Sequence, residues 1–157
     1  MALVEVHRKD APSLWAEVDE ADLAVLSKHR WYPEHGRFTT YAQTMIRKPD
    51  GQRTSIRMHT LLTGYGLCDH VNRNGLDNRR ANLREATTSQ NGANRVSSKG
   101  SPFKGVCWDK TNLKWKAYIT VEGTRISLGY HTTAERAAHA YDIKAAEVFG
   151  DFALLNF

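Results

Sequence analysis

The sequence predicts an α+β protein in which small antiparallel sheets are combined with a few short helices. Three observations lead to this class. The first part of the chain is β-rich, with short apolar runs separated by turn residues. A turn rich in Asn and Gly follows and leads into a polar segment that can form a helix. The last part has the pattern of a three-stranded antiparallel sheet packed on one helix.

The N-terminal β-rich unit begins with two predicted strands, residues 3–6 and 14–18. Asp19 is expected to cap a short helix after the second strand, with Asp22 in its first turn. A predicted hairpin then turns at Gly36. Three aromatic side chains of this hairpin are expected to pack inside the unit: Trp31, Phe38 and Tyr41.

The C-terminal unit covers residues 102–157. Its helix is expected to start after Thr132 or Thr133, to place small alanine side chains against a sheet, and to end at Gly150. The three strands before this helix are predicted at Gly105–Trp108, Lys114–Val121 and Thr124–Tyr130.

Strand alternation predicts which face of the C-terminal sheet is open, because successive side chains point to opposite faces. Ala117 and Ile119 should point toward the helix, which leaves the intervening polar and basic residues on the other face. That face should be positively charged and would orient the unit on a polyanion with its strands first. The candidate contacts are Lys104, Lys116, Tyr118, Thr120 and Arg125.

The charge of the chain favours an anionic partner. The formal net charge is +5 and the isoelectric point is about 9.3. The excess is local, since residues 72–101 hold six basic side chains against two acidic ones, a net charge of +4. No apolar run approaches the ~20 residues needed to cross a bilayer, and the N-terminus lacks the apolar core of a signal peptide. We therefore expect a cytoplasmic protein without membrane partners.

The number and spacing of the cysteines argue against two kinds of stabilising cross-link. Cys68 and Cys107 lie far apart in sequence and form no CxxC pair, so neither a disulfide framework nor a structural zinc site is indicated. Cys68 is expected to be a small core residue on the strand that carries Asp69.

The segment from Asp69 to Asn91, DHVNRNGLDNRRANLREATTSQN, holds the main chemical signal. Asp69 and Asn91 carry oxygen donors that suit a hard divalent cation such as Mg²⁺. His70 can accept a proton near neutral pH. Basic side chains that would suit phosphates follow on the same segment, and together these groups indicate hydrolysis of a phosphodiester. The basic side chains are Arg79, Arg80 and Arg84.

This segment resembles the HNH nucleases, in the subgroup of phage and intron homing endonucleases. Asn82 follows His70 by 82 − 70 = 12 residues and Asn91 follows it by 91 − 70 = 21, which matches the spacing of the ββα-metal motif. The resemblance implies that His70 is the general base and that Asn82 holds its imidazole by a hydrogen bond. Asp69 and Asn91 would bind the metal. The final Asn in place of a His corresponds to the HNN variant, which favours Mg²⁺ or Mn²⁺ over Zn²⁺.

Two neighbouring features have alternative interpretations. His59 lies 70 − 59 = 11 residues before His70, and either contacts the scissile phosphate or is a structural, hydrogen-bonded histidine, which we favour. Residues 95–101 have the composition of a linker, and their cations Arg95 and Lys99 either follow a phosphate backbone or belong to a simple spacer. The predicted domains are therefore 1–94, the linker 95–101, and 102–157.

The C-terminal unit resembles the APETALA2/ethylene-response-factor DNA-binding domain, through the phrases FKGV, KWKAYI, ISLGYHTTAERAAHAYD and ALLNF. In that family the three-stranded sheet enters the major groove. Where plant members have base-reading Arg, this chain has Cys107 and Asp109, and Ser127 replaces a common Trp. Fold and DNA binding are thus implied, while the target sequence is not.

The sequence as a whole predicts a metal-dependent, site-specific DNA endonuclease of the homing type, encoded by a phage or mobile element and active in the host cell. It would act on double-stranded DNA without a small-molecule cofactor. A monomer that nicks one strand is the default, and a dimer is the alternative. One rival function is a DNA-binding regulator with an inactive HNH unit. A second rival is an RNA-processing or non-specific toxin-like nuclease.

Overall fold

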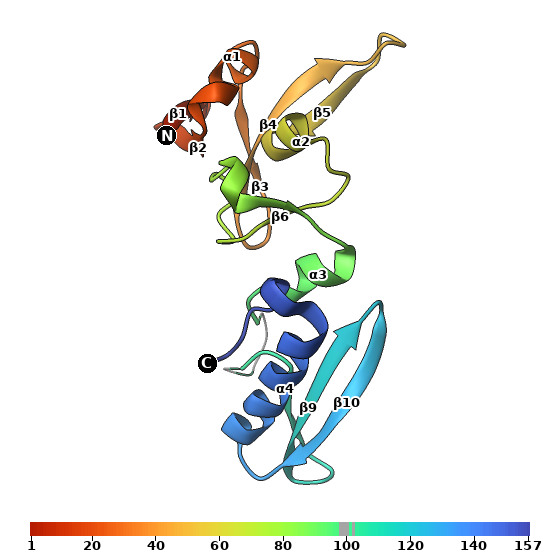
Figure 1. The fold of residues 1–157 in the computed structure, drawn as a ribbon. Helices are drawn as coiled ribbons and strands as arrows, with labels where there is room; N and C mark the ends of the chain where they lie inside the picture. The colour runs from red at the N-terminus through yellow and green to blue at the C-terminus, as the bar shows by residue number, and fades with distance from the viewer. Residues whose placement is uncertain (98–100, 102) are drawn as a thin grey trace. The chain divides into compact units, whose positions relative to one another are not determined.

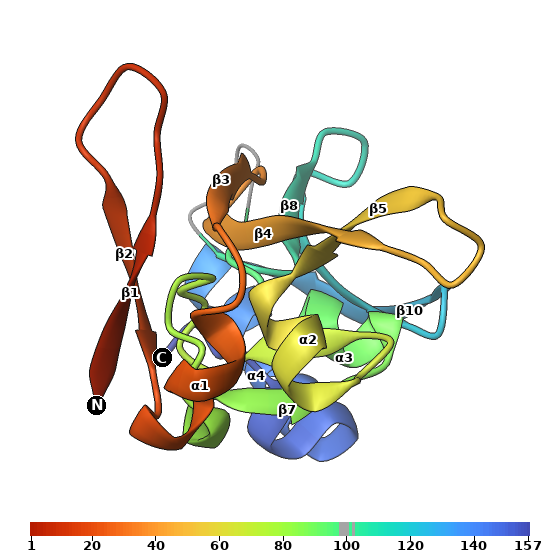
Figure 2. The same cartoon turned by 90° about the horizontal axis from the view of Figure 1, so that it is seen from above.

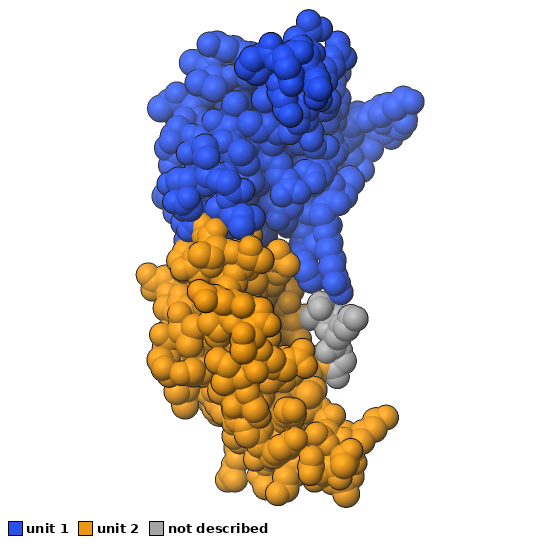
Figure 3. Space-filling view, turned by 90° about the vertical axis from the view of Figure 1, so that its right-hand side faces the viewer, with its two compact units in different colours: residues 1–85 blue, residues 86–157 orange. Residues whose placement is uncertain are grey.

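The computed structural model describes residues 1–97, 101 and 103–157 (Figures 1 and 2). It confirms the α+β class, since small antiparallel sheets are combined with short helices and a longer C-terminal helix. The described residues form two compact units, Met1–Glu85 and Ala86–Phe157, which Figure 3 colours separately. This division lies earlier in the chain than the segment 95–101, so the helix that follows Glu85 belongs to the second unit.

The first unit begins with an antiparallel strand pair, β1 (Ala2–Val6) and β2 (Leu14–Val18), as predicted. The short helices η1 (Glu20–Asp22) and α1 (Leu23–Leu26) follow. Asp19 stands at the N-cap position, but its side chain makes no capping bond and instead accepts a hydrogen bond from the backbone N of Arg80 at 2.8 Å. The predicted capping bond of Asp19 was therefore wrong, because its carboxylate instead connects two segments that are distant in sequence.

A second sheet in this unit has the strand order β3-β4-β5, with β3 (Tyr32–His35), β4 (Thr40–Arg47) and β5 (Arg53–Arg57). Its first hairpin turns at Gly36, as predicted. In Figure 1 the ribbon formed by β4 and β5 projects from the rest of the unit. Helix α2 (Met58–Thr63) follows β5 directly.

The core of the first unit lies between these strands and helices. Trp31 is 1% exposed, and its indole Nε1 donates to the Leu26 carbonyl at 3.0 Å. Phe38, expected inside, is 46% exposed in the loop between β3 and β4, where the guanidinium of Arg37 lies over its ring. The other buried apolar residues of this core are Val6, Ala16, Val18, Leu26, Ala42 and Met58.

The first unit ends with a two-stranded antiparallel ribbon, β6 (Cys68–His70) and β7 (Leu83–Glu85). A long turn and the short helix η2 (Arg80–Asn82) connect its strands. Cys68 is partly buried, and burial raises the pKa of its thiol to about 11, so it remains an uncharged packing residue.

The second unit contains the three-stranded antiparallel sheet β10-β9-β8 and two α-helices. Helix α4 begins after Thr133, whose side chain accepts from the Arg136 backbone N, and is capped by Gly150, as predicted. Apolar side chains of β8 and β9 pack against the alanine-rich face of α4. The elements are α3 (Thr88–Ala93), β8 (Val106–Asp109), β9 (Lys114–Val121), β10 (Thr124–His131), α4 (Ala134–Phe149) and η3 (Gly150–Phe152).

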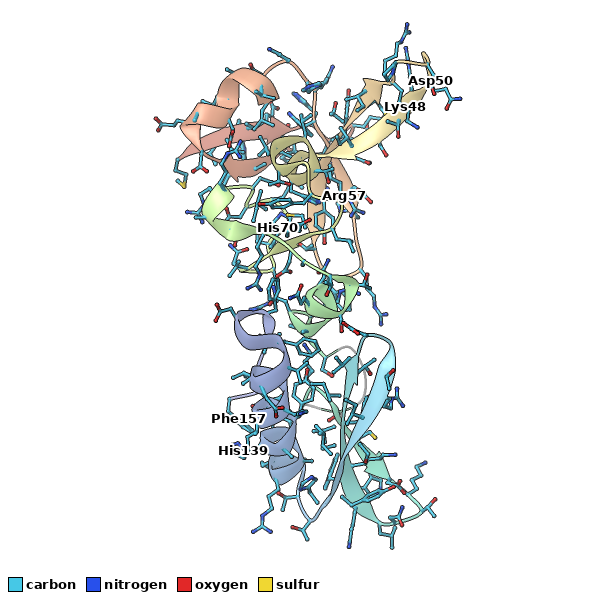
Figure 4. The ribbon with its side chains drawn as sticks, turned by 45° about the vertical axis from the view of Figure 1, so that its right-hand side comes forward. Lys48, Asp50, Arg57, His70, His139 and Phe157 are labelled. Carbon is cyan, nitrogen blue, oxygen red and sulfur yellow. The ribbon has the colours of Figure 1, made fainter. Side chains whose placement is uncertain are left out.

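The last residues tie α4 to the start of the sheet. Asp142, which is 8% exposed, accepts hydrogen bonds from the backbone N and the side-chain amide of Asn156. The Asn156 side chain also pairs with the backbone of Lys104 in both directions. The rings of His139 and Phe157 stack with centroids 4.5 Å apart (Figure 4). The final segment is therefore an integral part of this unit.

Candidate functional site

Strand β6 delivers the predicted Asp-His pair to the interior of the first unit. Asp69 lies opposite Arg84 on β7, and His70 lies opposite Leu83. Asp69 is 4% exposed and His70 is 5% exposed. The ribbon thus places a carboxylate and an imidazole side by side along the chain and largely removes both from bulk water.

His70 is enclosed by aromatic rings. Its ring meets that of His59 edge-on, with centroids 4.9 Å apart, and lies 5.8 Å from the ring of Tyr41. Burial lowers the pKa of His70, while the nearby Asn78 side chain and the charges of Asp69 and Asp77 act in the opposite direction. The net shift is downward, so His70 is a neutral imidazole at neutral pH and is able to accept a proton.

The turn between β6 and η2 is held by Asn82, which is buried. Its amide nitrogen donates to Asn72 Oδ1 at 3.0 Å and to the Asp77 carbonyl at 2.8 Å. Its amide oxygen accepts from the Asn72 backbone N at 3.0 Å. The expectation that Asn82 holds the imidazole of His70 is therefore corrected. Its donors and acceptor are used by Asn72 and by the Asp77 carbonyl, within the turn itself.

Asp69 forms an ion pair across the ribbon. Its Oδ2 accepts from Nε and Nη2 of Arg84, at 2.9 and 2.8 Å. Only 5% of the Asp69 side chain and 19% of the Arg84 side chain are exposed. Charge-assisted bonds of this kind hold a carboxylate in one orientation. Arg84, predicted to contact a phosphate, is thus placed against the proposed metal ligand.

The other two arginines of this segment are also paired with buried carboxylates. Arg79 donates from Nε and Nη2 to the two oxygens of Asp77, at 2.8 and 2.6 Å, and this pair lowers the pKa of Asp77. Arg80 donates to Asp22, with a shortest distance of 2.7 Å from Nη2. Three of the six cations in residues 72–101 are therefore paired with acids of the first unit, one of which, Asp22, is distant in sequence.

His59 lies on α2 and is 5% exposed. Burial lowers its pKa to about 3, with the charges of His70 and Arg57 acting in the same direction. Its ring packs edge-on against both His70 and Tyr41. A structural histidine was favoured from the sequence, and the contact with His70 is what the sequence did not reveal.

The second proposed metal ligand, Asn91, lies in the second unit, on helix α3. A capping box starts this helix: the Thr87 side chain accepts from the Gln90 backbone N, and the Gln90 side chain accepts from the Thr87 backbone N. The T-x-x-Q pattern that specifies this box was present in the sequence. Within residues 1–97, 101 and 103–157, no group of three or more His, Cys, Asp or Glu side chains is placed to hold a metal ion.

The open face of the sheet in the second unit carries four of the five contacts predicted for residues 102–157. Tyr118 and Arg125 are close together, with the guanidinium 4.4 Å from the ring centroid. The Lys116 ammonium lies 5.8 Å from the centroid of Tyr130, a residue that the sequence analysis did not select. Thr120 is exposed opposite Arg125 on the neighbouring strand. This face therefore combines cations with aromatic rings, as expected of a surface that contacts a polyanion.

The predicted contacts Lys104 and Arg95 lie elsewhere in the second unit. Lys104 is not on the open face, because its Nζ donates to the carbonyls of Gly92 and Ala93 at the end of α3. Arg95 is exposed just after α3. Lys99 lies outside the described residues.

Comparison with known proteins gives one significant relative. Over 88 residues the chain is 39% identical to a protein of Acanthamoeba polyphaga mimivirus named an uncharacterized HNH endonuclease. The match covers 56% of this chain and 46% of that protein, so the chain spans less than half the length of this relative. No family model and no solved structure matches the chain. No helix in the described part of the chain is long and apolar enough to cross a membrane. The geometry of the β6–β7 ribbon and this similarity together support a relationship to the HNH nucleases.

Proposed function

We propose that this chain is a divalent-metal-dependent endonuclease that cuts a phosphodiester of double-stranded DNA at a preferred site. The observation that carries the proposal is the buried, neutral His70 next to Asp69 on β6, in a chain with an HNH endonuclease relative. A neutral imidazole accepts the proton of a water molecule that attacks phosphorus. The aromatic enclosure by His59 and Tyr41 fixes the plane of this imidazole.

The metal in this proposal is Mg²⁺ or Mn²⁺, with Asp69 and Asn91 as its protein ligands. The donor chemistry fits, because a carboxylate oxygen and an amide oxygen are hard donors and leave positions for water and phosphate oxygens. When bound, such an ion would supply positive charge against the departing oxygen. Arg84 would keep the Asp69 carboxylate in a fixed orientation, which is the role that its ion pair favours.

The second unit would bring the nuclease to its site through the open face of its sheet. The cation and ring pairs on that face are suited to phosphates and to base edges of duplex DNA. One active site per chain implies one strand cut per visit, hence a nick by a monomer. A target-directed nuclease of this kind corresponds to the homing type.

The alternative is a DNA-binding regulator whose nuclease unit has no activity. Its specific support is the set of internal ion pairs, because Arg79, Arg80 and Arg84 are all held by carboxylates of the first unit.

One assay separates the two functions. Supercoiled plasmids carrying candidate target DNA are incubated with the wild-type chain in Mg²⁺ and in EDTA, and with the His70→Ala variant in Mg²⁺. The nuclease predicts relaxed circles in the first reaction alone. The exposed His35→Ala variant is the matched control and should nick like the wild type. DNA binding without metal-dependent relaxation would establish the regulator, and cutting of RNA and DNA alike would indicate a non-specific nuclease.

A further inference from the structure

The ribbon formed by β4 and β5 has two different faces. Its register pairs Gln43 with Arg57, Met45 with Ser55, and Arg47 with Arg53. Because directly opposed residues share a face, these six side chains lie on one side of the ribbon. Five of the six are exposed, and Gln43 is partly buried, whereas the side chains between them are buried or partly buried. Only the opposite face of the ribbon, formed by these intervening side chains, is therefore used for packing.

The exposed face has an excess of positive charge that the protein does not balance. Arg47 and Arg53 stand directly opposite each other, and like charges in this position destabilise a strand pair. In the described part of the chain, neither side chain has a hydrogen-bonded or ion-paired partner. Arg79, Arg80 and Arg84, in contrast, are each paired with an acid. Both side chains are exposed to solvent and are therefore available to an anionic partner outside the chain.

The same face leads to the proposed active site. At the base of the ribbon, Arg57 lies over the ring of Tyr41 at 4.7 Å, and Tyr41 lies against His70. Glu34 holds Arg57 through Nε and Nη2, at 2.7 and 2.6 Å, which leaves Nη1 pointing away from that pair. Figure 4 shows His70 and Arg57 near the base and Lys48 at the tip. From Arg57 to Arg53 the strand extends over ~14 Å.

We propose that this arginine face, defined by Arg47, Arg53 and Arg57, binds the phosphate backbone of duplex DNA next to the bond that is cut. The inference rests on the proposed nuclease function and identifies a substrate surface that is separate from the sheet of the second unit. A two-stranded ribbon fits the major groove of B-form DNA, whereas the major groove of an RNA duplex is too narrow and deep. The phosphates flanking the cleavage position would thereby neutralise the Arg47–Arg53 repulsion.

The test compares two double variants of the full-length chain, Arg47→Gln/Arg53→Gln and Arg8→Gln/Lys9→Gln. The second pair is also exposed in the first unit, lies in the loop after β1, and removes the same charge outside the ribbon face. Binding to duplex DNA is measured in EDTA over a range of salt concentrations. Loss of two phosphate contacts should reduce the slope of log affinity against log salt by about 2 and lower affinity on the order of 10–100-fold near 0.1 M salt. The variant Arg47→Lys/Arg53→Lys keeps the charge and should keep most of the slope.

An unchanged slope in Arg47→Gln/Arg53→Gln, or an equal loss in the control pair, would overturn the proposal. So would a wild-type affinity for duplex RNA equal to that for duplex DNA. Nicking by the wild type is measured in parallel with Mg²⁺. If the wild type nicks DNA and the Arg47→Gln/Arg53→Gln variant binds DNA normally, the proposed binding surface on the ribbon is wrong, while the proposed nuclease function is retained. If the wild type neither binds nor nicks DNA, both proposals fail.

Discussion

The buried His59 predicts a loss of stability in mild acid. In the unfolded chain this imidazole has its ordinary pKa of 6.5, and in the folded protein burial lowers the pKa to about 3. The folded state therefore favours the neutral ring. The stability that depends on this group is complete above pH 6.5 and is lost as the pH falls toward the folded pKa. Each pH unit within this window costs up to ~1.4 kcal/mol, so about 2 kcal/mol is lost between pH 7.5 and pH 5.0.

The measurement is urea unfolding at pH 7.5 and pH 5.0, followed by circular dichroism, for the wild type and the His59→Phe variant. Phe keeps a ring between His70 and Tyr41 but does not titrate. The wild type should lose about 2 kcal/mol more than the variant between the two pH values. His70 is present in both proteins, so the acid loss caused by its own burial occurs in both. The His35→Phe variant, changed at an exposed position, should behave like the wild type. Equal acid losses in the wild type and in His59→Phe would refute the reasoning.

Two further substitutions test the β6–β7 ribbon and its turn. Arg84→Ala leaves the Asp69 carboxylate buried without its ion pair. The free energy of unfolding, measured by urea titration, should fall by about 3–5 kcal/mol. A change below ~1 kcal/mol would contradict a structural ion pair. Asn82→Ala removes the bonds to Asn72 and to the Asp77 carbonyl, and should cost about 1–3 kcal/mol of stability. It should also slow plasmid nicking by ~10–100-fold, a smaller loss than that caused by His70→Ala, and nicking at the wild-type rate would show that the turn does not position the site.

The elements of this fold that depend on local pattern could be predicted. The strands of the second unit, the cap at Thr133 and the stop at Gly150 are confirmed because period-2 alternation and helix-end chemistry are properties of neighbouring residues. The open face of β9 follows from the same alternation. Tyr130 was missed because the register shifts between Ser127 and Tyr130, next to Gly129 with a φ of 96°. An inserted residue reverses which side chains face outward.

The surroundings of the proposed active site could be predicted less well, because they depend on pairs that are distant in sequence. Arg80 and Asp22 are 58 residues apart, and no local pattern links them. The sequence showed three arginines in a basic segment, while the fold showed that each has a carboxylate partner. The Asn82 role was wrong for a related reason. The Asn82 side chain has both donors and an acceptor, and its hydrogen bonds hold the long turn between β6 and η2 together. It is therefore not used to hold the His70 ring.

Helix α3 has a practical consequence for dissecting this chain. Its last residue, Ala93, belongs to an apolar cluster with Ile119 and Phe149, and its carbonyl accepts from the Leu154 backbone N at 3.0 Å. A fragment cut at Arg95 would expose this cluster to solvent and invite aggregation, whereas one cut after Glu85 keeps the helix with its supports. If the shorter fragment failed to shift a DNA probe, the failure would reflect a damaged fold and would not measure recognition. Footprinting of the isolated C-terminal half therefore requires the longer fragment.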